Sequence, residues 1–526
     1  MSPSQVADLK EVSFATQGWQ GGLNIRDSLA QLQPNELRRA ENITYDAAGG
    51  ISKRPGTTNL GGFGTAGSRA LSCYTYYRGM TAPQVLIHTS AGEIVYTNDL
   101  TASPPVWTTI VSGLSTTQPA SFETENSKCY FAEGTLLGQW DGTTYTQITS
   151  APGGINFLRV WKDTMWAAGL GNPDRVYSSS AGDPSSWPAA NWVDILHGDG
   201  DYISGLASDG LYLIVAKHRR IQVITDPALF SNRTADWEKG AESHNSWIHH
   251  EDKLYFVSRL GVCWWQGDSS ARLISFKIDP LFDPHVLNLG RSWMVSGYAF
   301  GSRVGWAFPE YGSNSNTIVL EYYPRLGPIY QISGNIGPGP WTIHRMPVGN
   351  FTTVRQGGTE GLFGGHPTAN KFMKCFDSTG VDDGQAYFGT AEGAPMSIQS
   401  PILTKYLRRM HVVGVGSMII QLKRNYRQGI YKTVPVNFGT GQEIWNEPGD
   451  LWNNSLWGPD PLIKEHIFDL DAYFQVVSLY ITDADQDTGL NLLPVGTKDV
   501  SLTAGSWALY QVTFDAFLLG IRSELP

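Results

Sequence analysis

The stretch KLYFVSRLGVCWWQG, from Lys253 to Gly267, contains two apolar runs joined by a short Arg-Leu-Gly turn. Both faces of each run are apolar, as they also are in LYLIVAK at 211–217. A sheet built from such strands would expose apolar side chains on two sides, so it becomes stable only when equivalent sheets cover both faces. The stretch therefore predicts a fold in which similar small sheets pack against one another.

The same rhythm of strand, polar turn and aromatic-rich strand recurs along most of the chain. Its turns SAGE, WDGT and SDGL each place glycine where a tight hairpin needs a positive φ. About seven units between residues 66 and 380 give a period of roughly 45 residues, which is typical of β-propeller blades. We therefore expect an all-β protein with a propeller of six to eight blades, seven being the preferred number.

Composition agrees with this fold class. The 526 residues include 58 glycines, 29 prolines and 18 tryptophans but only 16% charged residues, which favours strands and turns over long helices. The net charge of −10 argues against non-specific electrostatic binding of nucleic acid. Four widely spaced cysteines without a CxxC pair are expected to be small buried hydrophobes of a chain folded in a reducing cytosol. Neither a signal peptide nor a membrane anchor is expected.

Three parts are expected along the chain. The blade rhythm stops at a stretch rich in Gly, Asp and Pro around residues 380–400, and longer strands such as MHVVGVGSMIIQLKRN follow it. We predict an N-terminal latch or closure segment at 1–65, a propeller at 66–390 and a C-terminal β-sandwich-like domain at 391–526.

The segment from Gly21 to Gly56 differs from the blades. Pro34 or Asn35 can start a short helix that ends near Asn42, with Leu37 and Ala40 facing the body of the protein. The outward side chains of this helix would be those of Arg38, Arg39 and Glu41. A strand ending at Pro55 would follow, because proline cannot donate to a ladder. The segment either latches onto a neighbouring subunit or closes the propeller within its own chain.

This segment also carries a family resemblance. Its matching residues are Gly21 to Asn24, Leu32 to Glu36, Ala40 to Asn42, Gly49 to Ile51 and Lys53 to Gly56. They resemble the N-terminal signature of the nozzle (tail tubular B) and related stabilisation or hub proteins of tailed bacteriophages. The stretches Arg175 to Ser208 and Lys253 to Gly267 look like blade segments of that family.

The resemblance implies a structural virion protein in the neck or tail. It would be synthesised in the host cytoplasm and would form a ring, with a hexamer favoured, between a portal or adaptor protein and distal tail or fibre proteins. Genome DNA would be retained by the ring and would pass through it on ejection without sequence-specific binding. An acidic lumen is expected, because like charge lowers friction with the phosphates. The expected subunit-contact residues are Leu37, Arg38, Arg39, Lys53, Arg54, Arg408, Arg409, Lys423 and Arg424.

No enzyme activity, cofactor or metal is expected. Aspartates at 163, 174, 183, 209 and 252 are interpreted as turn residues, and SSSAGDPSSW at 178–187 lacks the spacing of a sialidase Asp-box. His249 and His250 would point to opposite faces of a strand, so a metal site shared with His244 and Glu251 is disfavoured. The acidic stretch DADQDTG at 483–489 departs from the EF-hand spacing and is interpreted as a turn, with a divalent cation as the alternative.

Two further alternatives remain open. The cations between Lys405 and Lys432 form either a solvated strand face or a docking surface for an acidic region such as that of Asp469, Asp471 and Asp483. The rival function is that of a carbohydrate-binding propeller whose tryptophans, in NWVDI, CWWQG and GPWTI, stack on sugars instead of filling the blade cores. Loops at 311–317 and 333–340 are candidate gates.

Overall fold

The computed structural model describes residues 11–16, 18–79, 82–267, 269–327, 339–397, 400–427, 429–438, 464–483 and 507–520. Within these ranges the chain is almost entirely β, and its helical turns are the short 3₁₀ segments η2 (His244–Ser246), η3 (Phe276–Phe282) and η4 (Leu289–Met294). None of the helices in these ranges has the length and hydrophobicity of a membrane span. The predicted all-β class is confirmed.

The chain divides into two compact units. The propeller unit comprises Gly56–Glu321 and Arg345–Gly384, and the sheet unit comprises Met1–Pro55, Tyr322–His344 and Gln385–Pro526. The backbone therefore passes from one unit to the other four times. The domain boundaries were expected after residues 65 and 390, and the chain passes between the units at 55/56 and 384/385. Residues 322–344 were expected inside the propeller but belong to the sheet unit.

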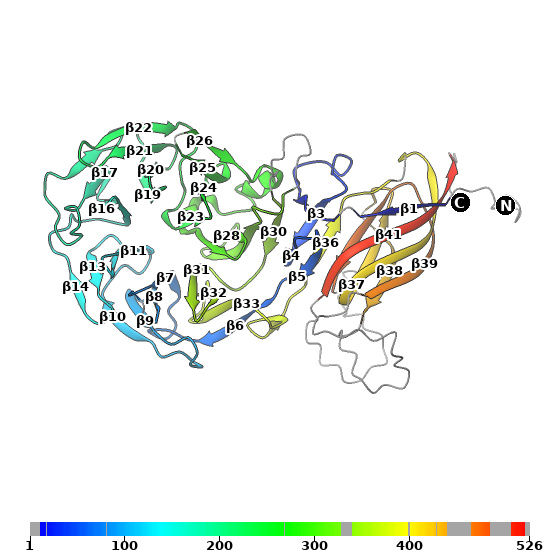
Figure 1. The fold of residues 1–526 in the computed structure, drawn as a ribbon, viewed down its shortest axis with the longest axis horizontal. Coiled ribbons are helices and arrows are strands. Elements are labelled where there is room, and N and C mark those ends of the chain that lie inside the picture. The colour runs from blue at the N-terminus through cyan, green and yellow to red at the C-terminus, as the bar shows by residue number, and fades with distance from the viewer. Residues whose placement is uncertain are drawn as a thin grey trace, which may run out of the picture. The chain divides into compact units, whose positions relative to one another are not determined.

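Five blades of the propeller unit are separate four-stranded antiparallel sheets (Figure 1). Their strands are β7 (Ala70–Tyr76), β8 (Gln84–Thr89), β9 (Glu93–Thr97) and β10 (Thr108–Ser112); β11 (Ser121–Glu125), β12 (Lys128–Ala132), β13 (Leu137–Trp140) and β14 (Tyr145–Gln147); β15 (Phe157–Trp161), β16 (Thr164–Gly169), β17 (Asn172–Ser178) and β18 (Trp192–Asp194); β19 (Ile203–Ser208), β20 (Leu213–Lys217), β21 (Ile221–Asp226) and β22 (Ser231–Asp236); and β23 (Ile248–His250), β24 (Lys253–Ser258), β25 (Gly261–Gln266) and β26 (Ser269–Leu273).

A sixth separate sheet closes the ring. It joins β31 (Asn350–Gln356), β32 (Thr359–Gly365) and β33 (Phe372–Asp377) to β6 (Gly56–Gly61), and β34 (Val381–Asp382) pairs beyond β6. Its strands β33 and β6 are antiparallel, with Met373 opposite Asn59. One sheet thus holds the first and last strands of the unit, so closure occurs within the chain. The closing strand starts at Gly56, which corrects the expectation that the whole of Gly21 to Gly56 closes the propeller.

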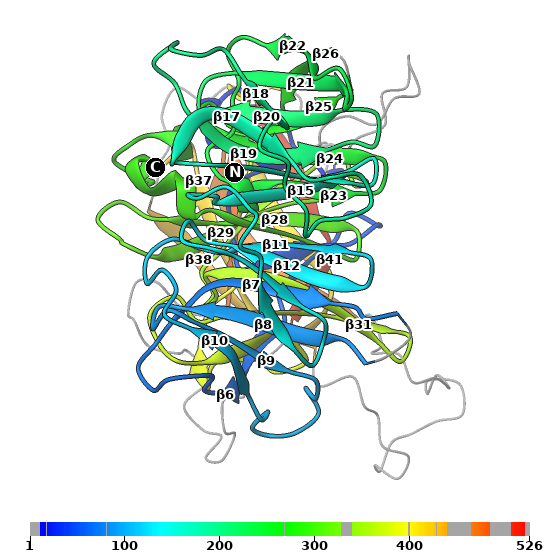
Figure 2. The same cartoon turned by 90° about the vertical axis from the view of Figure 1, so that its left-hand side faces the viewer.

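The inner strands of neighbouring blades contact one another around the ring, except that β19 contacts η2, the turn that precedes β23. In order they are β7, β11, β15, β19, β23, β27 and β31, where β27 (Ser296–Phe300) pairs with β28 (Arg303–Pro309) and then β29 (Asn316–Tyr322). The strands β27 to β29 therefore complete the ring together with the six separate sheets. Figure 2 shows the blades from the side, with β7 and β8 beside β11 and β12. The predicted propeller of six to eight blades is confirmed.

The hydrophobic cores lie between blades. One core packs Ile214, Ala216 and Val223 of one blade against Phe256 and Trp265 of the next. All residues of β16 and of β20 are buried, so these central strands are covered on both faces, as their sequences predict. Burying a side chain of this size contributes roughly 1.5–3 kcal/mol. The inter-blade cores are therefore what holds the ring together.

Short polar side chains on or beside the inner strands bond each blade to the next. Ser72 Oγ donates to Ala120 O (2.9 Å), Ser204 Oγ to Ala241 O (2.6 Å) and Ser243 Oγ to Val295 O (2.7 Å). At the closing blade Asn350 Nδ2 donates to Ala70 O (3.0 Å). These side chains satisfy buried backbone carbonyls that have no ladder partner across the gap between blades.

Lys217 is a buried cation between two blades. Its Nζ donates to Asp174 Oδ1 of β17 (2.8 Å), to Asp199 Oδ1 in the loop before β19 (2.6 Å) and to Leu196 O (3.2 Å). The Lys217 side chain is fully buried, whereas both carboxylates retain some exposure. Burial opposes ionisation of Asp174, but the hydrogen bonds from Lys217 and from Gly198 N–H outweigh it and lower the pKa of that carboxyl.

The sheet unit is assembled from distant parts of the chain. Its strands are β1 (Glu11–Ala15), β2 (Gly22–Leu23), β3 (Glu36–Glu41), β4 (Ile43–Tyr45), β5 (Ile51–Lys53), β30 (Trp341–His344), β35 (Gln385–Ala386), β36 (Thr390–Gly393), β37 (Thr404–Arg424), β38 (Ile430–Asn437), β39 (Lys464–Phe474), β40 (Val477–Thr482) and β41 (Trp507–Gly520). N-terminal strands pair with C-terminal ones, since β3 lies beside β36 and both β1 and β5 lie beside β41.

The long strand β37 serves two ladders. Its first half pairs with β39 and β41, and its second half, after Gly416 at φ 78°, pairs with β38 and β40. Lys405 near its start donates from Nζ to Gln475 O (2.8 Å), and Asn425 just beyond its end accepts from Gln475 N–H (2.8 Å). The strand therefore folds back and links two layers of C-terminal strands, in keeping with the expected sandwich-like arrangement.

The helix expected from Pro34 or Asn35 to Asn42 is wrong. Residues 36–41 form β3, and Asn42 follows with a φ of 54°. Leu37 and Ala40 are buried, as a helical face would bury them, but they pair across the sheet with Gly393 and Ala391. Ladder partners more than 350 residues away thus override the local helical pattern.

Replacing Lys217 with Met tests the buried cation. The substitution leaves Asp174 and Asp199 without their ammonium partner, and removal of one member of a buried pair costs about 3–5 kcal/mol. We expect the thermal midpoint to fall by roughly 5–10 °C. The same change at Lys374, whose side chain is 42% exposed beside Asp377, is the matched control and should shift the midpoint little. Equal thermal midpoints for the two variants would contradict the conclusion that Lys217 is a stabilising buried cation.

His88 should make the fold sensitive to mild acid. It is fully buried in β8, its Nδ1 accepts a hydrogen bond from Ala120 N–H (3.1 Å), and burial lowers its pKa to about 4. Below about pH 6.5 the His88 imidazole becomes protonated in the unfolded chain but stays neutral in the folded chain. The free energy of unfolding therefore falls by roughly 2 kcal/mol by pH 5.

The variant His88→Gln should lose this part of the pH dependence. Urea unfolding at about pH 7 and pH 5 measures it, and His285→Gln, at an exposed histidine, is the control. A variant at position 88 that keeps the full slope of the native chain would show that another group is responsible.

Candidate functional site

One face of the propeller collects the loops that shape a hollow. Neighbouring strands of a blade are antiparallel, so the inner strand and the third strand of every blade start on the same face. We call this side the start face. It carries the loops before β7, β11, β27 and β31 and the loops that enter β29 and β33. These loops converge from several blades, although they lie far apart in the sequence.

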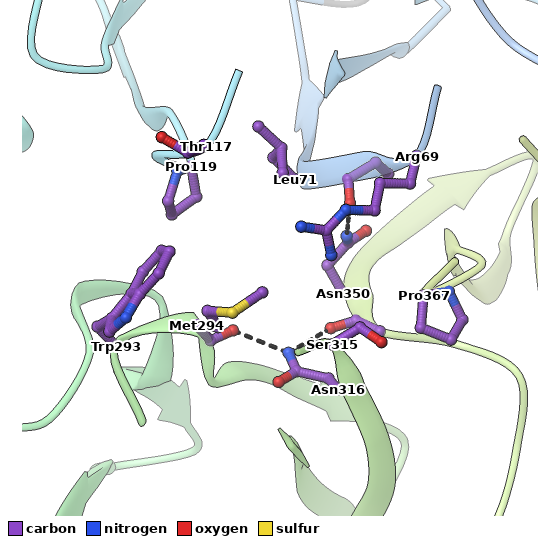
Figure 3. Close-up of a pocket in the computed structure, with 12 residues that line it drawn as sticks. Arg69, Leu71, Thr117, Pro119, Trp293, Met294, Ser315, Asn316, Asn350 and Pro367 are labelled. Atoms are coloured by element: carbon purple, nitrogen blue, oxygen red, sulfur yellow. Dashed lines mark hydrogen bonds between the residues drawn. The ribbon is translucent and has the colours of Figure 1, made fainter. Parts of the chain in front are cut away.

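A hollow of about 340 Å³ opens among these loops (Figure 3). Its wall includes Arg69, Thr117, Pro119, Trp293, Asn316 and Asn350. Asn316 Nδ2 donates to Met294 O (2.8 Å) and Gly349 O (2.7 Å). The Oδ1 atom of Asn350 accepts from Gly365 N–H (3.1 Å). The two amides therefore hold the wall in place, while the buried Asn316 Oδ1 has no hydrogen-bond partner among the described residues.

Arg69 gives the hollow its charge. Figure 3 shows its guanidinium pointing into the space between Asn350 and Trp293. Among the described residues no carboxylate lies within 4 Å of the guanidinium of Arg69 or of Arg291, which lies in η4. Burial, and then the charge of Arg291, lower the pKa of Arg69. The hollow is thus a small cavity with an uncompensated positive charge.

A second polar cluster lies on the start face around Glu242. Ser292 Oγ donates to its carboxylate, and His218 Nδ1 lies 3.3 Å from Oε1. Burial raises the pKa of Glu242, although the Ser292 hydrogen bond and the charges of His218 and Arg259 oppose the shift. The charge of Asp201 also raises the pKa of Glu242.

Side chains cross the propeller axis and bond its blades. His244 Nδ1 accepts from Leu206 N–H (3.2 Å), while its Nε2 bonds Ser121 Oγ (2.8 Å), which also accepts from Leu158 N–H (3.0 Å). The ring centroids of Phe157 and His244 lie 5.3 Å apart. Four blades are joined by this network, so side chains occupy the axis at this level.

The structure separates the histidines that could have shared a metal. His249 is exposed, His250 on the same strand is buried, and His249 Nε2 bonds Ser208 O (2.7 Å). No group of three or more candidate ligands occurs in the part of the chain that the structure describes. DADQDTG lies outside the described residues except for Asp483, which pairs with Lys53 at 2.6 Å.

The signature residues are mostly internal to the sheet unit. Leu37 and Arg54 are buried, and Arg54 Nε donates to Asn42 Oδ1 (3.1 Å) while its guanidinium lies 4.0 Å from the Tyr387 ring centroid. Lys53 is buried against Asp483. The other two expected subunit-contact residues of this segment, Arg38 and Arg39, are partly exposed. Arg38 donates to Ile25 O (3.0 Å) and Arg39 pairs with Glu41 (2.7 Å). As subunit contacts, all five stay predictions, but Leu37, Lys53 and Arg54 face their own chain.

The C-terminal cations also find partners within the chain. Arg409 pairs with Asp469 (3.3 Å), Lys423 pairs with Glu392 (2.8 Å), and Arg424 lies over Tyr431 at 4.1 Å. Arg408 is half-buried in β37. The acidic region suggested as an external partner therefore supplies Asp469 to Arg409 and Asp483 to Lys53 within the same protein.

Other residues singled out in the sequence are distributed as follows. Asp163, Asp183, Asp209 and Asp252 lie at turns, whereas Asp174 holds Lys217. Trp265 fills an inter-blade core, and Trp341 is buried in β30, the strand that pairs with β29. Trp192 is exposed, but the Arg175 guanidinium covers its ring at 3.5 Å. The loop 311–317 lies on the start face, and 333–338 lies outside the described residues.

Sequence reasoning missed Arg69, Arg291, Glu242 and Lys217. Lys217 had one signal, because it ends the apolar run LYLIVAK and a charge beside so many buried residues needs a buried partner. The two arginines had none, since their association depends on loops from opposite ends of the propeller sequence.

Comparisons with known proteins identify similar folds at low similarity. No family model and no curated protein matches the chain. BBS1N in its crystal structure in complex with ARL6DN has a TM-score of 0.42 at 11% identity, over 62% of this chain and 97% of that one. The computationally designed Ika8 protein has a TM-score of 0.35 at 10% identity, over 60% and 99%. The extracellular domain of the putative one component system BT4673 from B. thetaiotaomicron has a TM-score of 0.41 at 9% identity, over 78% and 59%.

The charge of Arg69 should reduce the stability of the propeller at low salt. In Arg69→Met the aliphatic stem remains while its repulsion with Arg291 disappears, so we expect the thermal midpoint to rise by about 1–2 °C. The gain should vanish at roughly 0.5 M NaCl, where screening is strong. Arg355→Met, at an exposed arginine paired with Glu360, is the control and should show no such gain. A midpoint that falls equally at both salt concentrations would contradict the repulsion.

Proposed function

We propose that this protein is a structural virion protein of a tailed bacteriophage and a subunit of a neck or tail nozzle ring. The ring extends the portal channel, retains packaged DNA and lets it pass on ejection. The observation that carries the proposal is the signature between Gly21 and Gly56. Several of its residues are buried and determine how the N-terminal strands pack, so the signature reflects the fold.

Steric limits on the signature glycines support this reading. A Cβ atom at Gly22, which has a φ of 67°, would lie 2.4 Å from Pro340 Cα in the sheet unit. A Cβ atom at Gly56 would lie 2.0 Å from Val381 O in the propeller unit. Both distances are too short for any side chain. Together with buried Lys53 and Arg54, these glycines specify how the N-terminal strands fit their neighbours, so a shared signature indicates a shared sheet unit.

The filled propeller axis determines where DNA would pass. The His244 and Phe157 network joins four blades across the axis, so a duplex cannot run through the propeller of a single chain. In the proposed assembly the channel is therefore enclosed by several copies. Of the tryptophans named for the carbohydrate-binding alternative, Trp265 and Trp341 are buried, Arg175 covers Trp192, and Trp264 is half-buried.

Ring formation tests the proposal directly. Purified full-length chain at micromolar concentration should give ring particles with a central channel in negative stain. Mass photometry should give a peak at a multiple of 57.8 kDa, the sixfold multiple being favoured. The mechanism is enclosure by copies of one subunit, so the rings should form without DNA. A chain that stays monomeric across this concentration range would contradict a self-assembling ring.

A further inference from the structure

We propose that the hollow on the start face is an anion-binding site that receives the carboxylate or phosphate group of a small ligand between Arg69 and the wall formed by Thr117, Pro119 and Trp293. This site goes beyond the proposed ring function, because it lies within the propeller of one chain and does not depend on assembly.

The argument begins with charge. Arginine stays protonated in proteins, so the two half-buried guanidiniums of Arg69 and Arg291 keep a positive field at the hollow. Other buried or half-buried cations of this unit, Lys217 and Arg159, pair with Asp174 and Glu123 respectively. Neither Arg69 nor Arg291 has such a partner within the described residues. An oxyanion is the complementary group, since it can accept two parallel N–H bonds from one guanidinium.

Geometry places this charge where a ligand can reach it. The Arg69 guanidinium extends into the hollow and is not folded against the outer surface (Figure 3). The Asn316 and Asn350 amides bond the backbone around it and keep the wall rigid. A rigid wall lowers the entropy lost on binding. Trp293 supplies an apolar surface on the side of the hollow opposite Arg69, and a ring attached to the bound acidic group can pack on it (Figure 3).

Size limits the ligand class. The volume of about 340 Å³ includes space that is open to solvent and the enclosed part is small, so only an acidic group can enter the hollow and any ring attached to it lies at the mouth. Glucuronate is a probe whose acidic group carries a ring, and inorganic phosphate is a free oxyanion. The two probes share the chemistry that Arg69 recognises, and they differ in whether Trp293 takes part.

Isothermal titration of the full chain tests the site, with sodium glucuronate and sodium phosphate added separately at constant ionic strength. We expect saturable one-to-one binding of at least one probe and a loss of at least about tenfold in affinity in Arg69→Met and in Arg291→Met. Arg355→Met is the matched control. Arg355 lies near the opposite end of an inner strand, its side chain is 77% exposed, and it already pairs with Glu360.

Each outcome decides the matter. Tighter binding of glucuronate than of phosphate supports the site and assigns a ring-bearing acid, while equal or tighter phosphate binding supports it and assigns a free oxyanion. The absence of saturable binding by either probe overturns the proposal, as does binding that Arg69→Met and Arg355→Met weaken equally. Thermal midpoints of all variants confirm that each is folded, and the result is independent of whether the chain forms rings.

Discussion

The constraint on which the propeller depends is that its sheets are apolar on both faces. A strand such as β20, in which every residue is buried, is stable only with a partner sheet on each side. A linear stack would leave two exposed ends, whereas a ring leaves none. Closure of the ring by β6 beside β33 follows from this requirement, because the last blade gains its outer strand from the first residues of the unit.

Burial on both faces creates a second problem, which concerns polar groups between blades. The ring solves it with short side chains near the inner strands, such as Ser204 and Ser243, and with one fully buried cation, Lys217. These hydrogen bonds fix how neighbouring blades align more than they stabilise the ring, because each contributes only about 1 kcal/mol net to stability. The hollow differs from the Lys217 site in this respect. Within the described chain, neither Arg69 nor Arg291 has a carboxylate beside its guanidinium.

Much of the fold could be predicted from the sequence, because blade strands are specified locally by their apolar runs and glycine turns. KLYFVSRLGVCWWQG forms β24 and β25 as its pattern indicates. The prediction fails where pairing is nonlocal. Leu37 and Ala40 have helical spacing, but a ladder with β36 makes them a strand. The candidate site could not be predicted at all, since loop convergence brings Arg69 near Arg291 without leaving a motif.

The strand order has a consequence for synthesis on the ribosome. The chain makes β1 and β5 more than 450 residues before their shared partner β41. The strand β6 likewise waits for β33, which is made more than 300 residues later. The blades from β7 onward can form in succession while these early strands still lack their neighbours. Nascent chains therefore carry unpaired strand edges for most of their synthesis, and such edges promote aggregation unless a chaperone or the ribosome surface shields them.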